Sequence, residues 1–193
     1  MPATPLNQLR EALDATGRLV AAVGEGQWEA PTPCAEWNVR QLVSHLVVGN
    51  LLFSQVVAGD ATPLEEIRQR IGTDPLGEDP VAAYRTGADA VLAAFGRPGA
   101  LDRAVTVPVG TVPGVVALHL RIVEALVHGW DLARAIGRQL EVDDQLTQQE
   151  LAFTREKLDL PGNRRPFAPP QPVAEDAPAL DRLAALLGRT VHP

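Results

Sequence analysis

Three side chains on one predicted helix have the types and the spacing to hold a cation. Glu124 and His128 are four residues apart. At about 100° per residue they lie roughly 40° apart on one helix face and about 6 Å apart along its axis. Asp131 falls about 20° to the other side of Glu124, on the same stripe. Glu124 and His128 can therefore reach one ion, although the same spacing also fits an ordinary ion pair at a solvent seam, worth only a few tenths of a kcal/mol.

A third candidate ligand lies on an earlier helix. His45 shares a helical face with apolar residues, so its imidazole points toward the core. A backbone or hydroxyl partner would satisfy such a ring. The alternative is that His45, Glu124 and His128 converge from two adjacent helices and leave a fourth position open, which is typical of catalytic zinc. Asp131 would then hydrogen-bond to one of the ligands and orient it.

Two further side chains have chemistry of their own. Arg121 lies about 60° from Glu124 and could pair with a substrate carboxylate, but the pattern favours a salt bridge to Glu124 or exposure to solvent. Cys34 lies a few residues outside the first turn of the helix that Asn38 begins, so we expect a packed loop thiol and not a nucleophile. The sequence thus predicts no catalytic nucleophile supplied by the protein.

The remaining candidates have structural interpretations. His119 lies on the apolar face of its helix and is expected in the core or at a seam, whereas His192 is expected in solvent. The tryptophans are expected to be packing anchors: Trp28, Trp37 and Trp130. Arg164 and Arg165, beside Phe167, could cover the mouth of a site.

Periodicity and capping signals predict an all-α bundle with crossing loops and a short C-terminal helical extension. Asn38 with Gln41 forms a capping box at one helix start. Five long helices are predicted at 4–24, 38–58, 80–95, 113–136 and 143–158, with a helical turn at 64–71, a single edge strand at 104–109 and a terminal helix at 179–187. We expect one domain over 1–193, with a core at 4–158 and a proline-rich tail and terminal helix at 159–193.

Composition excludes several classes of protein. The 193 residues include 24 acidic and 17 basic ones, and the net charge of -7 argues against a nucleic-acid binder. The 46 % apolar content and the mean hydropathy of -0.01 are typical of a soluble globular chain. The apolar stretches are judged too short for a bilayer, and the first ten residues do not resemble a signal peptide. With Cys34 as the lone cysteine, a reducing, cytoplasmic location is expected.

Three motifs carry a resemblance to a known family. TPCAEWNVRQLVSHL, at 32–46, resembles the opening motif of the actinobacterial branch of the DinB-like superfamily. This branch includes the amino-terminal domain of mycothiol-dependent maleylpyruvate isomerases. EALVHGWDLARA, at 124–135, resembles the second motif of that branch. The tail RPFAPPQPVAEDAPALDRLAALLGR, at 165–189, is similar to the ending of an uncharacterised actinobacterial metal-binding family.

This resemblance implies a fold and an activity. It implies a DinB-like four-helix bundle in which His45, Glu124 and His128 hold a divalent metal, usually zinc. It also implies an enzyme that uses a low-molecular-weight thiol such as mycothiol on a small-molecule electrophile. The characterised isomerase has a further folded carboxy-terminal domain, whereas this chain has a short proline-rich tail.

Several mechanisms fit these residues. A thiol that adds to a double bond and is expelled after rotation isomerises the alkene, and addition without expulsion is thiol transfer. A metal-dependent hydrolase is the alternative, with Asp131 as the candidate base. A non-catalytic metal-binding bundle, in the form of a homodimer, is a third interpretation. Two histidines and a carboxylate also match non-haem iron oxygenases, which the helical fold disfavours by analogy only.

Overall fold

The computed structural model describes residues 4–60, 62–72, 74–158 and 167–191, and the predictions for Arg164, Arg165 and His192 lie outside these residues. Its elements are, in chain order, α1 (Pro5–Ala21), the 3-10 turn η1 (Glu25–Gln27), α2 (Val39–Ala58), α3 (Leu64–Ile71), α4 (Pro80–Phe95), β1 (Ala104–Val107), β2 (Gly110–Pro113), α5 (Gly114–Ala135), α6 (Asp144–Leu158) and α7 (Ala179–Leu186).

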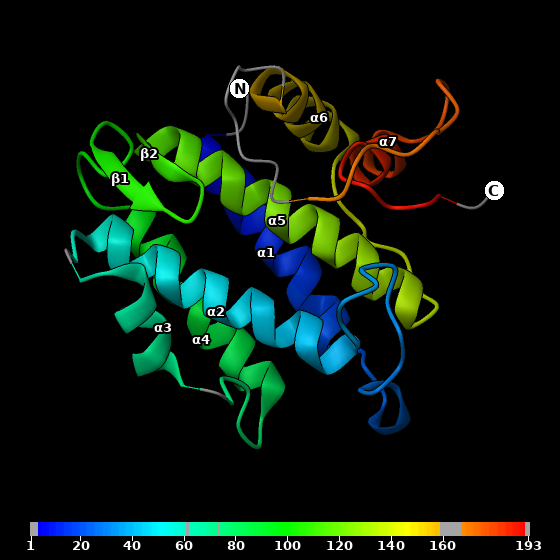
Figure 1. Cartoon of the computed structure of the whole chain (residues 1–193), viewed down its shortest axis with the longest axis horizontal. Coiled ribbons are helices and arrows are strands. Elements are labelled where there is room, and N and C mark those ends of the chain that lie inside the picture. The colour runs from blue at the N-terminus through cyan, green and yellow to red at the C-terminus, as the bar shows by residue number, and fades with distance from the viewer. Residues whose placement is uncertain (1–3, 61, 73, 159–166, 192–193) are drawn as a thin grey trace.

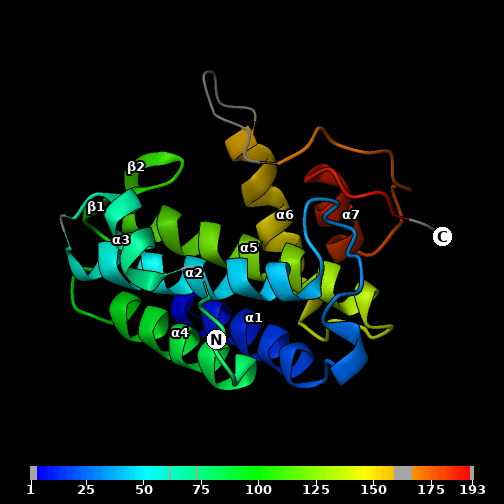
Figure 2. The ribbon, with the colours of Figure 1, turned by 60° about the horizontal axis from the view of Figure 1, so that its bottom comes forward.

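Four of the long helices close a ring. α1 packs against α4 and α5, and α2 packs against the same two helices from the other side. α6 and α7 lie on each other and on the outer side of α5 (Figure 1), so the bundle is closed on that side by the C-terminal part of the chain. Figure 2 shows α1 and α4 below α2 and α5. The predicted all-α bundle with a helical extension is confirmed.

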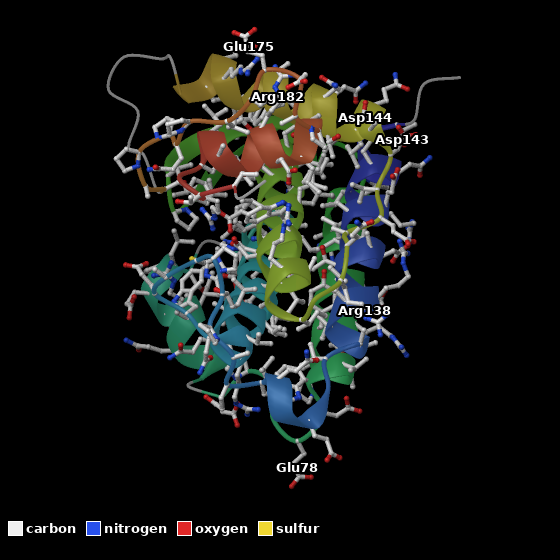
Figure 3. The ribbon with its side chains drawn as sticks, turned by 90° about the vertical axis from the view of Figure 1, so that its right-hand side faces the viewer. Glu78, Arg138, Asp143, Asp144, Glu175 and Arg182 are labelled. Atoms are coloured by element: carbon white, nitrogen blue, oxygen red, sulfur yellow. The ribbon has the colours of Figure 1, made fainter. Side chains whose placement is uncertain are left out.

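The C-terminal elements form one end of the molecule. In the side-chain view, Glu175 and Arg182 lie at that end and Glu78, just before α4, lies at the opposite end (Figure 3). The candidate ligands lie on α2 and α5.

α5 is the central helix, because it contacts α1, α2, α6 and α7. Its apolar residues cover a wide arc and include Leu118, Ile122 and Leu126, all 0 % exposed. Burying each such side chain contributes roughly 1.5–3 kcal/mol. Gly129 allows the close approach of α1, since a Cβ there would lie 2.7 Å from the Thr16 hydroxyl. A helix buried this widely forces its few polar residues to meet other protein groups or an internal cavity.

α2 begins and ends where its capping residues predict. The Asn38 side chain accepts a hydrogen bond from the Gln41 amide at 2.9 Å, the Gln41 side chain accepts one from the Asn38 amide at 3.0 Å, and Gly59 ends the helix with a φ of 95°. By length and composition alone, this helix could cross a membrane, so the expectation that every apolar stretch is too short was wrong. Half of this apolar stretch is buried in the bundle. Core helices of soluble proteins also meet this criterion of length and composition, so the finding is weak evidence for a membrane span.

Two other local predictions differ from the structure. The single edge strand expected at 104–109 is an antiparallel hairpin, in which Val107 pairs with Gly110. Pro108 lies in its turn and Gly110 adopts a φ of 125°, which favours glycine. The first helix ends at Ala21, with Ala22 as its C-cap, and not at Gly24, which is extended and begins a separate 3-10 turn.

Candidate functional site

A cavity of about 660 Å³ opens between α2 and α5. The loop before α2, the hairpin and the C-terminal tail complete its walls. Cavities of this size hold small-molecule ligands. All three predicted ligand side chains line this cavity, and so does Arg121.

The three candidate ligands meet at one point of the cavity wall. Glu124 Oε2 lies 3.0 Å from His45 Nε2 and 3.4 Å from His128 Nε2. One ligand atom from each residue lies within 4.8 Å of the other two. The side chain of His128 is 2 % exposed, that of Glu124 21 % and that of His45 35 %. The group is therefore fixed on the α5 side and accessible from the cavity on the α2 side.

Both imidazole rings are held by neighbouring groups. The His45 ring stacks on Trp37, with centroids 4.3 Å apart and an angle of 29° between the planes. His128 Nδ1 lies 3.1 Å from Asp131 Oδ2, and Asp131 is fully buried. When this nitrogen carries the proton and donates to Asp131, the Nε2 lone pair of His128 points toward Glu124. Asp131 therefore contacts His128, and its role in orienting that ring as a metal ligand stays a prediction.

A residue that the sequence interpretation missed completes this arrangement. Arg189, in the tail after α7, donates from Nη2 to Asp131 Oδ2 at 2.8 Å and from Nε to Oδ1 at 3.2 Å. Its Nη1 donates to the Leu187 carbonyl at 2.8 Å, and its guanidinium lies 5.4 Å from the centroid of the Phe167 ring. Asp131 is therefore a buried carboxylate with a buried, bidentate partner. The only signal in the sequence was the tail motif that ends at Arg189.

The electrostatics of the group favour an ionised carboxylate. Burial alone would raise the pKa of Glu124, but hydrogen bonds and charges of His128 and His45 hold it well below its ordinary value. Burial disfavours the charged form of His45 and lowers its pKa. Burial also acts against the charge of His128, yet Asp131 and Glu124 outweigh it and raise the pKa of that ring. The ionised carboxylate of Glu124 thus lies between the His45 ring, which resists protonation, and the His128 ring, whose protonated form is favoured.

The other cavity residues depart in part from their predictions. Arg121 is only 1 % exposed and forms no salt bridge with Glu124 within the described residues, so the favoured interpretation of Arg121 was wrong. Cys34 is a half-buried loop thiol, as expected, but its sulfur lies within 4.8 Å of ligand atoms of His128 and Asp131. Burial raises the pKa of this thiol. Phe167 does line the cavity.

The remaining candidate, His119, lies apart from the cavity. Its Nδ1 is 2.7 Å from Glu150 Oε1 on α6, and its ring stacks on Phe153. It is a partly buried seam histidine, as the helical wheel indicates.

Comparison with solved structures places this bundle in a class of helical proteins. The match to the crystal structure of a DinB-like protein from Bacillus subtilis covers 72 % of this chain and 96 % of that protein's chain, with 16 % identity and a TM-score of 0.55. The crystal structure of the mycothiol-dependent maleylpyruvate isomerase covers 77 % of this chain at 18 % identity, with a TM-score of 0.59. The match spans 66 % of that isomerase's length. These likenesses show a DinB-like fold.

The sequence defines the family more narrowly. Residues 9–133 match the mycothiol maleylpyruvate isomerase N-terminal domain, and the chain belongs to this family. Uncharacterized proteins from two strains of Mycobacterium tuberculosis are 36 % identical over 190 residues, which is 97 % of this chain and 99 % of theirs. The family match ends before α6, so Arg189 and the tail over the cavity lie outside it.

Proposed function

We propose that the protein binds a divalent metal, zinc, through His45, Glu124 and His128. We also propose that it uses a low-molecular-weight thiol such as mycothiol either to isomerise a small electrophile or to transfer the thiol to it. The observation that carries this proposal is the convergence of two imidazole Nε2 atoms on one carboxylate oxygen, at 3.0 and 3.4 Å, on the wall of a cavity. Membership of a mycothiol-linked family supports the choice of thiol.

The donor set fits this metal. Two imidazoles and one carboxylate are ligands that zinc accepts, and three protein ligands leave a position for an exchangeable group. Asp131 can keep the proton of His128 on Nδ1, so that Nε2 is available as a ligand. A divalent ion held there would supply Lewis acidity, which deprotonates a coordinated thiol near neutral pH.

The protein's own residues would bind and orient the reactants. The cavity has room for a thiol beside a small electrophile, and apolar side chains such as Leu52 and Phe53 form part of its wall and exclude water. In an isomerisation, the sulfur forms a bond to one carbon of a double bond, the π electron pair moves to the activating group, and both changes reverse after rotation. In a transfer, the carbon–sulfur bond remains, and the electron pair returns to the neighbouring carbon of the former double bond, which takes up a proton. We expect this chemistry in a single-domain protein in the cytoplasm.

A hydrolase mechanism is less well supported by the contacts of Asp131. Asp131, the candidate base for activating a water, is fully buried and already accepts hydrogen bonds from His128 and Arg189. A base must reach the proton that it removes. Asp131 therefore fits an orienting role better than a catalytic one. A non-catalytic metal-binding bundle would not account for the accessible cavity beside His45, Glu124 and His128.

Cobalt substitution tests the proposal. Cobalt-loaded protein is titrated with mycothiol, with N-acetylcysteine as a thiol control, and the absorption spectrum is recorded. Direct sulfur ligation is expected to give a new charge-transfer band that saturates, and the His45→Ala variant is expected to lack it. Cobalt-loaded wild-type protein that gives no band with either thiol would contradict the thiol assignment, and failure of the wild type to retain cobalt would contradict the metal assignment.

A further inference from the structure

The C-terminal segment, residues 167–191, forms one wall of the cavity and reaches the candidate ligands. The centroid of its Phe167 ring lies 6.4 Å from that of the His128 ring. The segment follows the region that matches the family, residues 9–133, so this wall lies outside the matched domain. Four residues of the segment line the cavity: Phe167, Ala168, Gly188 and Arg189.

The end of α7 directs Arg189 toward α5. The Gly188 amide donates to the Ala185 carbonyl at 3.0 Å. The Arg189 amide donates to the Ala184 carbonyl, also at 3.0 Å, and Gly188 has a φ of 90°. These features define a Schellman motif, which ends a helix and redirects the chain. A Cβ on Gly188 would lie 2.5 Å from the Ala168 Cβ, so the turn packs tightly against the earlier part of the segment.

The Asp131 carboxylate on α5 depends on Arg189 for charge compensation. The Asp131 side chain is 0 % exposed and that of Arg189 is 6 % exposed. Nε and Nη2 of Arg189 both donate to this carboxylate, which also lies 3.1 Å from His128 Nδ1. Removing one partner of a buried ion pair leaves an uncompensated charge and is strongly destabilising. The contact between Asp131 and His128 is therefore maintained by a residue of the C-terminal segment.

A second attachment of the segment to α5 bypasses the site. α7 lies beside α5 (Figure 1). Trp130 Nε1 donates to Asp181 Oδ1 at 2.6 Å, and Arg134 Nη2 lies 3.3 Å from the same oxygen. The Arg134 side chain is 48 % exposed and does not line the cavity. One arginine thus attaches the segment beside the candidate ligands, and another attaches it away from them.

We propose that Arg189 is a positioning residue, which couples the docking of the C-terminal segment to the binding of a divalent cation. It acts through Asp131, so that a docked segment holds the His128 ring with its Nε2 toward Glu124. The role of His128 as a metal ligand rests on the proposed function, whereas the attachment of the segment through Arg189 and Asp131 does not. Such coupling is reciprocal, so the cation strengthens docking by the factor by which docking strengthens its binding.

The first measurement uses metal-free protein. After dialysis against a chelator, hydrogen–deuterium exchange followed by mass spectrometry measures the protection of the α7 amides and of the Gln171 amide, which donates to the Ala185 carbonyl at 2.8 Å. Arg189→Met is expected to speed their exchange at least tenfold, because it removes the bidentate partner of a buried carboxylate. Arg134→Met is the matched control and is expected to change exchange less than twofold. Equal protection in wild type and Arg189→Met would overturn the attachment.

The second measurement is zinc affinity, by competition with a chromophoric chelator. Arg189→Met is expected to weaken zinc binding about 10–100-fold, and Arg134→Met to leave it unchanged. Arg189→Lys is expected to recover part of the loss, since lysine keeps the charge but not the paired donors. A Lys variant as weak as the Met variant, or a Met variant with wild-type affinity, would contradict the positioning role.

A double variant tests the route through Asp131. Asp131→Asn combined with Arg189→Met is expected to bind zinc no more weakly than the weaker single variant, because the two residues act on His128 as one unit. Losses that add would show that Arg189 does not act through Asp131. Zinc is also expected to slow exchange of the α7 amides in wild type and not in Arg189→Met. Exchange that zinc does not slow in a zinc-bound wild type would contradict the coupling.

The outcomes remain separate from those of the proposed function. A wild type that binds no zinc contradicts the proposed function and the coupling, and the metal-free exchange still decides whether Arg189 attaches the segment. Thermal unfolding establishes that each variant is folded, and if Arg189→Met is not, Gly188→Ala decides. This change keeps every charge but displaces Arg189 through backbone strain and the clash with Ala168. Faster exchange and weaker zinc binding are expected, and wild-type values for both would overturn the inference.

Discussion

Helix α5 carries two histidines with carboxylate neighbours, and the two regions around them differ. His119 Nδ1 lies 2.7 Å from Glu150 Oε1, and its ring stacks on Phe153 with centroids 4.9 Å apart. His128 lies 3.1 Å from Asp131 and 3.4 Å from Glu124. In both regions a partly or fully buried imidazole contacts a carboxylate, so the pair alone does not distinguish a site.

The distinguishing features are a second imidazole and a cavity. The His45 and His128 ring centroids are 5.0 Å apart, and both rings line the cavity. The His119 region joins α5 to α6 and does not line that cavity. A histidine–carboxylate pair between two helices is therefore a structural contact by default. It becomes a candidate ligand set only where a further ligand and space for a reactant converge on it.

The largest expected effect is loss of the metal when one region is altered. His45→Ala removes one of three ligands and is expected to leave the purified protein with only a small fraction of the wild-type zinc. His119→Ala is the matched control, because it removes a histidine from the other region and is expected to leave the zinc content unchanged. Metal analysis by mass spectrometry measures both. Equal metal in wild type and His45→Ala would show that the convergence on Glu124 is not a metal site.

The second prediction separates the two carboxylates beside His128. Glu124→Gln is expected to abolish stable metal retention, because the amide replaces a charged ligand. Asp131→Asn is expected to weaken metal affinity by about 10–100-fold, which is typical when a group that orients a ligand is altered. Competition with a chromophoric chelator measures both affinities. The reverse order would mean that Asp131, and not Glu124, binds the ion.

The sequence predicted the relative positions of the candidate ligands on α5 because a helix fixes such positions locally. The stripe of Glu124, His128 and Asp131 follows from 3.6 residues per turn. The same rule placed His45 on the inner face of α2, whose start was set by the capping box of Asn38. Most helix bounds were predicted within a few residues for this reason.

What could not be predicted depends on long-range packing. Arg189 is 58 residues from Asp131 in sequence, so no local period links them. Arg121 was placed correctly on the wheel, but its burial depends on the missing side chain of Gly49 on another helix. Trp37 was predicted to be a packing anchor, and only the structure shows its indole stacked on His45. Each is a tertiary contact with a partner that the local sequence does not specify.

The smallest expected effect concerns the pairing of α5 with α6. Burial raises the pKa of Glu150, partly offset by the hydrogen bond and charge of His119, and Glu150 Oε2 has no described hydrogen-bond partner. A carboxyl group whose pKa is raised by folding stabilises the folded state most below its ordinary pKa of 4.5, and this contribution is lost as the pH rises through the raised value. Glu150→Gln removes this dependence and is expected to raise the free energy of unfolding at pH 8 by about 1 kcal/mol relative to wild type.

Urea unfolding at a series of pH values measures that difference. The advantage of Glu150→Gln over wild type is expected to shrink as the pH falls toward 4.5, because wild-type Glu150 then takes up its proton. Glu156→Gln is the control on the same helix, since the Glu156 side chain is 72 % exposed and its replacement is expected to change stability little at any pH. If Glu150→Gln were instead less stable than wild type at pH 8, the ionised Glu150 would be a net stabilising partner of His119. The His119 region would then be an ion pair that fastens α6 to α5, and the contrast with His128 would rest on the cavity and His45 alone.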